Sequence, residues 1–211
     1  RKGNPDMRKM LFALAALAAL ALLAPNSGVA QGANNQIGIY TTANPDFDNI
    51  TDVDTSVNGN GPHTAYVVLS NPWSDQTDMA IATVGGFEFR IEWGGLFVTP
   101  VIDPSATNFQ TPPDFYCGAN IPVGGDAAAT LITLTLASFT SDPVSLFITP
   151  VSDSGTQTIP GGIAITDFDD NYRITQAYVS SGDFTEAVFG FNTTVVPNED
   201  ASWGDVKNLY R

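Results

Sequence analysis

Residues 87–93 read Phe-Glu-Phe-Arg-Ile-Glu-Trp, so large apolar and charged residues alternate without interruption between two Gly-Gly pairs. Successive side chains of a β-strand point to opposite faces of the sheet. The alternation therefore puts the four apolar residues on one face and the three charged residues on the other, which predicts a half-buried strand. The chain is expected to be a β-sheet protein in which one face of the sheet is buried against the core.

The charged face of this strand offers two glutamates, which are the obvious residues to test for glycosidase chemistry. Glu88 and Glu92 are four residues apart, which is about 13 Å at the rise of a strand. That separation exceeds the range used by retaining and inverting glycosidases. Because Arg90 lies between them, we interpret the three residues as a solvated sheet face that neutralises most of its own charge.

Further strand patterns occur along most of the chain, and no helical period is found before the last ten residues, apart from the N-terminal apolar run. Many short strands separated by turn-rich segments are typical of a β-sandwich. The segments 44–62 and 103–128 are rich in Gly, Pro, Asn or Asp, and they are expected to be loops. The expected strands cover residues 36–41, 64–70, 80–84, 87–93, 96–102, 130–139, 144–151, 162–166, 172–179 and 187–191.

Two of these strands share a motif that contains proline. Residues 96–103 and 146–153 are identical at six of eight positions, which fits either a duplicated half-domain or two strands in similar surroundings. Pro100 and Pro150 lack a backbone N–H, so we expect both at sheet edges, bulges or strand ends.

The strand at residues 84–93 resembles an early strand of cohesin-like domains, which commonly carry a Gly-Phe-x-Phe-x-Leu/Ile-x-Tyr/Trp pattern. Residues 65–71 are similar to the first core strand of that family, and residues 129–136 to a later one, so the resemblance covers about residues 64–152. It implies an all-β, two-sheet immunoglobulin-like sandwich that serves as a docking or scaffold module on an exported bacterial protein. The Tyr-Asp-Pro that usually follows the strand is replaced by Trp93-Gly94-Gly95.

The N-terminal region has the pattern of a secretory signal peptide. Arg8-Lys9 precede an apolar run of about fifteen residues, and small residues up to Ala30 suggest cleavage after that position. The run is shorter than the roughly 20 residues of a transmembrane helix. We therefore expect a leader with upstream residues (1–30), a β-sandwich domain (31–197), and a C-terminal segment (198–211). The protein is expected to be secreted, at the cell surface or in the periplasm, with no membrane span after cleavage.

The chain is strongly acidic, with 22 acidic and 8 basic residues and a net charge of −14. The predicted leader holds four of the basic residues and one acidic residue, which leaves the rest at −17. Such a surface repels nucleic acids and anionic lipids. The expected partner is another extracellular protein or a glycan.

Nothing in the sequence supports a catalytic site. The one histidine, His63, has no nucleophile motif near it, and the one cysteine, Cys117, lies in the expected 103–128 loop with no evident partner. The sequence also lacks enough His and Cys ligands for a zinc site and the glycine-rich motifs of a nucleotide-binding loop. We expect a non-catalytic protein with a buried or idle thiol, and an enzyme with carboxylate chemistry is the last of three functional hypotheses.

Calcium is the one cofactor that the sequence suggests, because closely spaced carboxylates can present several oxygens to a hard cation. Two segments have this spacing, although neither forms a complete EF-hand loop. A solvated acidic turn is the alternative in both places. The candidate ligands are Asp167, Asp169, Asp170 and Asn171 in one segment, and Asp46, Asp48, Asp52 and Asp54 in the other.

A calcium-stabilised carbohydrate-binding module is the second functional hypothesis. Such modules use exposed aromatic rings, and four aromatic residues fall in or beside expected loops: Trp73, Phe115, Tyr116 and Tyr178. Burial in the core is the competing role for each, because aromatic side chains gain much from burial.

The C-terminal segment predicts a short amphipathic helix that begins at Ser202. A helix of about ten residues is marginal alone in water, so it either docks on the domain or serves as a tail that an export or attachment system recognises. The residues of this possible sorting or docking tail are Trp203, Val206, Lys207, Leu209, Tyr210 and Arg211.

Overall fold

β-Strands are the only regular secondary structure in the described part of the chain, which comprises residues 34–45, 54–153 and 155–193 of a computed structural model. Within those residues no helix has the length and apolar composition needed to cross a bilayer. The predicted leader, the C-terminal helix and the domain boundaries at residues 30 and 197 lie outside the described residues and stay predictions. The strands are β1 (Gln36–Tyr40), β2 (Ser56–Val57), β3 (His63–Ser70), β4 (Trp73–Ser74), β5 (Met79–Ala80), β6 (Thr83–Glu92), β7 (Phe97–Ile102), β8 (Thr107–Asn108), β9 (Asp114–Pro122), β10 (Ala128–Ala137), β11 (Val144–Thr149), β12 (Ile163–Asp167), β13 (Arg173–Val179) and β14 (Phe189–Phe191).

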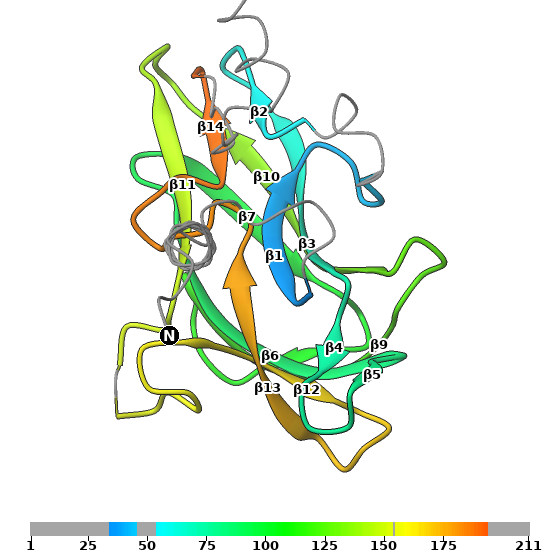
Figure 1. Cartoon of the computed structure of the whole chain (residues 1–211). Helices are drawn as coiled ribbons and strands as arrows, with labels where there is room; N and C mark the ends of the chain where they lie inside the picture. The colour runs from blue at the N-terminus through cyan, green and yellow to red at the C-terminus, as the bar shows by residue number, and fades with distance from the viewer. Residues whose placement is uncertain (1–33, 46–53, 154, 194–211) are drawn as a thin grey trace, which may run out of the picture. The chain divides into compact units, whose positions relative to one another are not determined.

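Two sheets face each other, and one strand joins them. The first sheet has the order β1-β3-β10-β7, with every pair antiparallel. β13 pairs in parallel with β1 and antiparallel with β12, so the hydrogen-bond ladder continues from the first sheet into the second (Figure 1). β7 stands at the end of this order, as the edge strand of the first sheet.

β6 is the central strand of the second sheet. β9 pairs along one edge of β6, and β8 pairs with β9. The other edge of β6 is shared by β12 and β11, which pair with its first and last parts respectively. β14 continues the sheet from β11, and β2 pairs with β14. The β11–β12 loop, residues 150–162, therefore leaves the sheet and returns to the same edge of β6.

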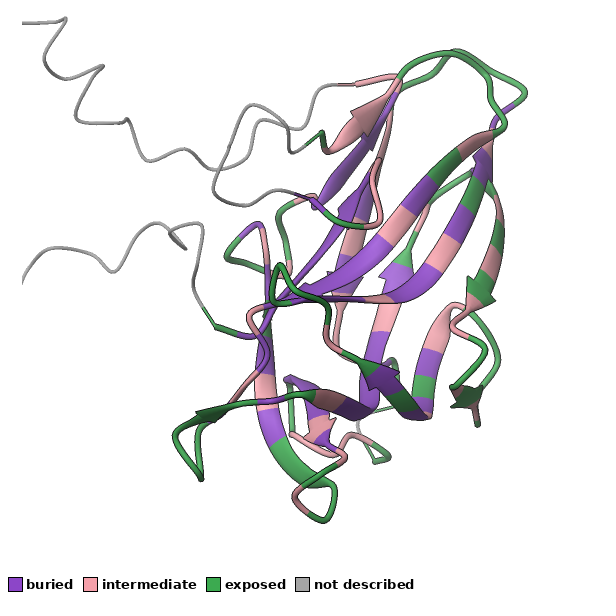
Figure 2. Cartoon of the chain, turned by 90° about the vertical axis from the view of Figure 1, so that its right-hand side faces the viewer, coloured by how far each residue is buried: buried purple, intermediate pink, exposed green. Residues whose placement is uncertain are grey.

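The core lies between the inner faces of the two sheets, as the alternating pattern predicts. Phe87, Phe89 and Ile91 are almost completely buried, and the Phe89 ring contacts Phe115 of β9 at 5.8 Å between centroids. Ile39 belongs to the same apolar cluster from the first sheet. Buried and exposed residues alternate as bands along several strands (Figure 2). Burial of these apolar side chains is the main source of stability, at about 1.5–3 kcal/mol for each large one.

The Gly85-Gly86 pair lies inside β6 rather than before it. The register of β6 against β9 shifts between Val84 and Gly86, which is a β-bulge. A Cβ on Gly86 would lie 2.6 Å from the carbonyl oxygen of Cys117, so only glycine allows β9 to approach this closely.

Most expected strands are present, and the all-β two-sheet sandwich is confirmed. The expectation that residues 103–128 form a loop is wrong, because β9 occupies the middle of that segment and pairs with β6. The placement of the two prolines is confirmed: Pro100 lies in edge strand β7, and Pro150 directly follows β11.

Candidate binding surface

Glu88 is buried, so the prediction of a fully solvated charged face on β6 is wrong. Only 3% of Glu88 is exposed, although its side chain points away from the core. Thr158 of the β11–β12 loop covers it and donates to its carboxylate from both the backbone N–H (3.0 Å to Oε1) and the hydroxyl (2.5 Å to Oε2). The outer face of β6 is shielded from solvent at Glu88 because this loop crosses it.

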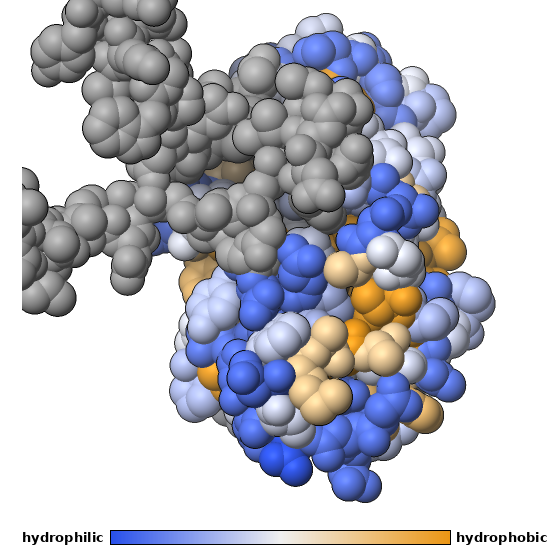
Figure 3. Space-filling model, turned by 45° about the vertical axis from the view of Figure 1, so that its right-hand side comes forward, coloured by the Kyte–Doolittle hydropathy of each residue, from blue (hydrophilic) through white to orange (hydrophobic). Residues whose placement is uncertain are grey.

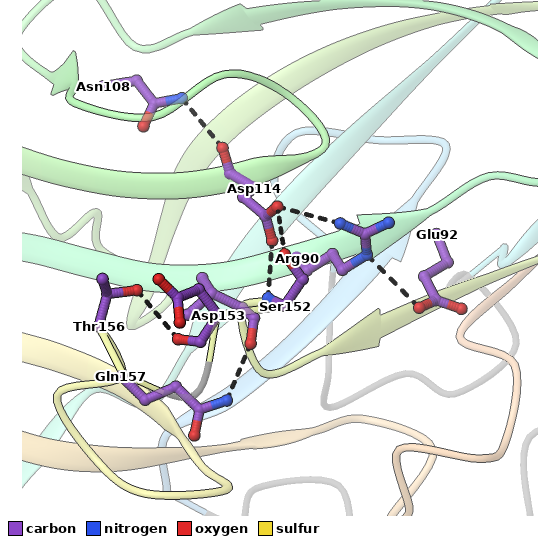
Figure 4. Close-up of polar contacts among 9 residues, drawn as sticks. Arg90, Glu92, Asn108, Asp114, Ser152, Asp153, Thr156 and Gln157 are labelled. Carbon is purple, nitrogen blue, oxygen red and sulfur yellow. Dashed lines mark hydrogen bonds and ion pairs between the residues drawn. The ribbon is translucent and has the colours of Figure 1, made fainter.

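The neighbouring charges hold the same loop in place (Figure 4). The Arg90 guanidinium lies 3.0 Å from the Asp114 carboxylate and 3.5 Å from that of Glu92. Asp114 also accepts hydrogen bonds from the backbone N–H and the hydroxyl of Ser152. Within the loop, the Gln157 amide donates to the carbonyl of Val151 at 2.8 Å. These groups are bound to one another, so the carboxylates of this face act as structural acceptors.

The first candidate calcium segment begins at the last residue of β12, and two of its three carboxylates have partners within the domain. Asp167 accepts a hydrogen bond from the backbone N–H of Asp169 at 3.0 Å. Asp170 pairs with Arg173 at 2.7 Å between Oδ2 and Nε. Asn171 has a positive φ of 51°, which suits the tight turn into β13.

In the second candidate segment only Asp54 belongs to the described residues, and it accepts a hydrogen bond from the backbone N–H of Ser56 at 3.0 Å. Asp46, Asp48 and Asp52 lie outside them, as do all six residues of the possible sorting or docking tail. Among the described residues, no three or more of the His, Cys, Asp and Glu side chains gather closely enough to hold a metal ion. The calcium site stays a prediction.

Cys117 lies on β9 with its side chain toward the core, and not in a loop. It is 5% exposed, and burial raises the pKa of its thiol to about 12. The prediction of a buried thiol is confirmed. His63 contacts the Phe191 ring at 5.6 Å between centroids, edge to face.

The four aromatic residues considered for sugar binding do not form one surface. Phe115 is fully buried in the core and Trp73 is half-buried in the β4–β5 hairpin. Tyr116 and Tyr178 are exposed, but they belong to β9 and β13, which are separated by β6 and β12. Core burial is therefore the right interpretation for Phe115.

A different set of exposed side chains shares the outer face of the first sheet. In the pairing of β7 with β10, Phe97 lies beside Ala137, Thr99 beside Thr135, and Val101 beside Thr133. The pairing of β10 with β3 extends two of these rows, to Thr64 and Tyr66. Phe139, just after β10, contacts the Phe97 ring at 4.7 Å between centroids. We call this surface the uncharged face; it comprises Thr64, Tyr66, Phe97, Thr99, Val101, Thr133, Thr135, Ala137 and Phe139.

The uncharged face has exposed apolar side chains at both ends, with Phe97 and Phe139 at one end and Val101 at the other. Phe97, Val101 and Phe139 are 58%, 59% and 85% exposed. β3, β7 and β10 contain no Asp, Glu, Lys or Arg, whereas β6, β9, β12 and β13 each contain at least one. The sequence predicted a strand at residues 96–102, but only the register shows that three strands build one face.

Elsewhere on the surface, exposed large apolar residues occur on other elements. Phe109 is 67% exposed and lies close to Gly118 of β9, and Met79 is exposed in the β4–β5 hairpin. The view in Figure 3 shows a largely hydrophilic surface, with a hydrophobic patch near its middle and smaller hydrophobic spots at its margins. Scattered exposed apolar residues are normal, whereas a group with aromatic ring contacts is informative.

The sequence matches no protein-family model and no curated protein. Two solved structures similar to this chain are type II cohesin domains from Acetivibrio cellulolyticus. One is a type II cohesin domain from the cellulosome, with 10% identity and a TM-score of 0.42; the alignment covers 76% of this chain and 98% of that one. The other is the type II cohesin dyad from the adaptor ScaA scaffoldin, with 12% identity and a TM-score of 0.41; the alignment covers 68% of this chain and 47% of that one. Both structures are cohesin domains, the family that the pattern of residues 64–152 resembles.

Proposed function

We propose that this chain is an exported, non-catalytic binding module that recognises its partner through the uncharged face. The exposed pair Phe97 and Phe139, at one end of that face, is the observation that carries the proposal. These two side chains expose on the order of 300 Å² of apolar surface, a size at which patches on monomers are often functional. Covering that area is worth up to about 7 kcal/mol before the costs of association.

The polar groups of the second sheet support a non-catalytic role. The Glu88 carboxylate is covered by Thr158, and that of Asp114 is bound to Arg90 and Ser152. A general acid or base has to reach a substrate, and neither carboxylate is free to do so. Export rests on the leader pattern in residues 7–30 of the sequence.

Aromatic substitutions on the two sheets test the proposal. The double variant Phe97→Ser/Phe139→Ser removes the rings of the uncharged face, and Phe109→Ser removes an equally exposed ring outside it. The full chain and both variants are assayed by biolayer interferometry against purified polysaccharides and extracellular proteins. We expect the double variant to bind the wild-type partner at least tenfold more weakly, and Phe109→Ser to bind it normally.

Two results would contradict the proposed function. One is wild-type binding that the double variant retains in full, since the partner would then use another surface. The other is a wild-type protein that binds no probe in the panel.

A further inference from the structure

We propose that the uncharged face binds a neutral polysaccharide chain; this inference rests on the proposed function and names the partner class of the same site. The first support is an array of hydroxyl groups. Thr99, Thr135 and Thr64 form a row across β7, β10 and β3, and Thr133 stands in the next row. Neighbouring strands are about 4.8 Å apart, and residues two apart along a strand about 6.7 Å. The array therefore repeats in two directions.

These hydroxyls are available to a ligand. The side chains of Thr64, Thr99 and Thr135 are exposed, and none of the three donates or accepts a hydrogen bond with another described residue. A threonine hydroxyl offers one donor and two acceptor lone pairs. Sugar hydroxyls have the same dual character, so a row of threonines can satisfy them in either direction.

The aromatic end of the face supplies the second element of sugar recognition. Phe97 and Phe139 meet edge to face with an interplanar angle of 66° at this end. Tyr66, beside Thr133 on β3, is a half-buried ring in the row of Val101 at the other end of the face. The faces of a pyranose ring carry C–H groups, which pack on aromatic rings. Ligand sites commonly combine an apolar surface with a few polar groups that fix orientation.

Charge decides between a neutral sugar and other partners. The chain carries a net charge of −14, so acidic polysaccharides and nucleic acids are repelled, and two copies of the chain repel each other. A face without charged residues interacts with a neutral chain at no cost in desolvating ions. Strand addition at β7 is discouraged by Pro100, which supplies no backbone donor to an incoming strand. The partner is therefore expected to lie on the side chains of the face.

The proposal is tested with defined polysaccharides and isosteric variants. The probes are neutral β-1,4-glucan, β-1,3-glucan and galactomannan, with polygalacturonate and alginate as acidic counterparts, measured by affinity electrophoresis at 20 and 500 mM NaCl. We expect binding to at least one neutral probe, a change of less than twofold with salt, and no binding to the acidic probes.

Threonine-to-valine substitutions keep the shape of the face and remove its hydroxyls. We expect Thr99→Val/Thr135→Val to weaken binding to the neutral probe at least tenfold, while Thr107→Val on β8 binds normally. Urea midpoints within the experimental error of wild type show that the variants fold. A protein partner or a second copy would tolerate the valines or bind them more tightly, because they add apolar surface.

The outcomes separate this inference from the proposed function. In one outcome, wild type binds no neutral polysaccharide, but it binds a purified protein or self-associates in sedimentation equilibrium. If Phe97→Ser/Phe139→Ser abolishes that binding, the inference is overturned and the proposed function stands. If a neutral polysaccharide binds equally well to the valine and serine variants, both are overturned.

Discussion

Glu88 shows at the scale of one residue how a polar side chain on an outward face becomes part of the interior. Its carboxylate accepts hydrogen bonds from the backbone N–H and the hydroxyl of Thr158, and it is 3% exposed. A buried carboxylate is costly unless hydrogen bonds replace its water. Thr158 therefore makes the burial of Glu88 possible, and the β11–β12 loop depends on that bond.

Replacing Thr158→Val is expected to lower the free energy of unfolding by about 1–3 kcal/mol, because Oε2 of a buried carboxylate loses the shorter of its two hydrogen bonds. The measurement is urea unfolding followed by tryptophan fluorescence. Thr99→Val is the matched control, since its exposed hydroxyl has no bond with a described residue, and it should change stability by less than about 0.5 kcal/mol. Equal effects of the two substitutions would mean that Thr158 does not stabilise the loop.

Two buried side chains that ionise at high pH, Tyr40 and Cys117, make the stability of the protein sensitive to alkali. Burial raises the pKa of Tyr40 to about 12, although a hydrogen bond from Ser180 acts in the opposite direction. Burial also raises the pKa of Cys117 to about 12. In the unfolded chain these groups titrate near 10 and 8.5. The unfolded state therefore loses its protons first, and stability present below pH about 8.5 is lost as pH rises toward 12.

We expect the free energy of unfolding to fall by several kcal/mol between about pH 8.5 and 12, since each pKa unit is worth about 1.4 kcal/mol. Urea midpoints at pH 8, 9, 10 and 11 measure the slope. Tyr40→Phe and Cys117→Ala should each make it shallower, whereas Tyr116→Phe, at an exposed tyrosine, should leave it unchanged. A midpoint that does not move with pH in wild type would refute this account.

At the scale of the element, β1 depends on Gly38, which leaves space for the side chain of Tyr40 in the same strand. A Cβ on Gly38 would lie 2.6 Å from the hydroxyl oxygen of Ser180 and would overlap the Tyr40 ring. Gly38 thus lets Tyr40 fold over its own strand toward Ser180.

Gly38→Ala is expected to destabilise the domain by about 1–3 kcal/mol, because Tyr40 and Ser180 must both shift. Gly95→Ala is the control, since nothing lies within 4 Å of a Cβ at that position. Thermal unfolding by circular dichroism compares the two. An equal transition temperature for both variants would show that the Tyr40 ring is not constrained by Gly38.

The strands differ in how far their local sequence predicts them. β6 and β10 combine alternation with large apolar residues, which is sufficient for a prediction. β9 also alternates, but its inward residues include the small Cys117 and Ala119, and Gly118 and Pro122 are turn residues. It is a strand because β6 pairs with it, so tertiary contact overrides a weak local preference.

At the scale of the whole molecule, charge is unevenly distributed. The chain carries 22 acidic and 8 basic residues, while β1, β3, β7 and β10 contain no Asp, Glu, Lys or Arg. Repulsion among acidic residues opposes the compact state, and salt screens it over about 10 Å at 0.1 M.

Raising NaCl from 10 to 500 mM at pH 7.5 is expected to increase the free energy of unfolding by about 1–2 kcal/mol, because screening relieves this repulsion. Urea unfolding at each salt concentration gives the change, and KCl should have the same effect as NaCl. A constant or falling stability would mean that ion pairs such as Arg90 with Asp114 outweigh the repulsion.

Local sequence was enough to establish the all-β class and the dry face of β6, because side-chain alternation depends only on neighbouring residues. Two other features required the tertiary structure. Thr158 covers Glu88 across a separation of 70 residues, and no local pattern predicts which polar face a distant loop will cross. Likewise, Phe97, Thr135 and Thr64 become one face only when the register of β7, β10 and β3 is set. Register arises from packing of the whole core, so the candidate binding surface is a property of the folded chain.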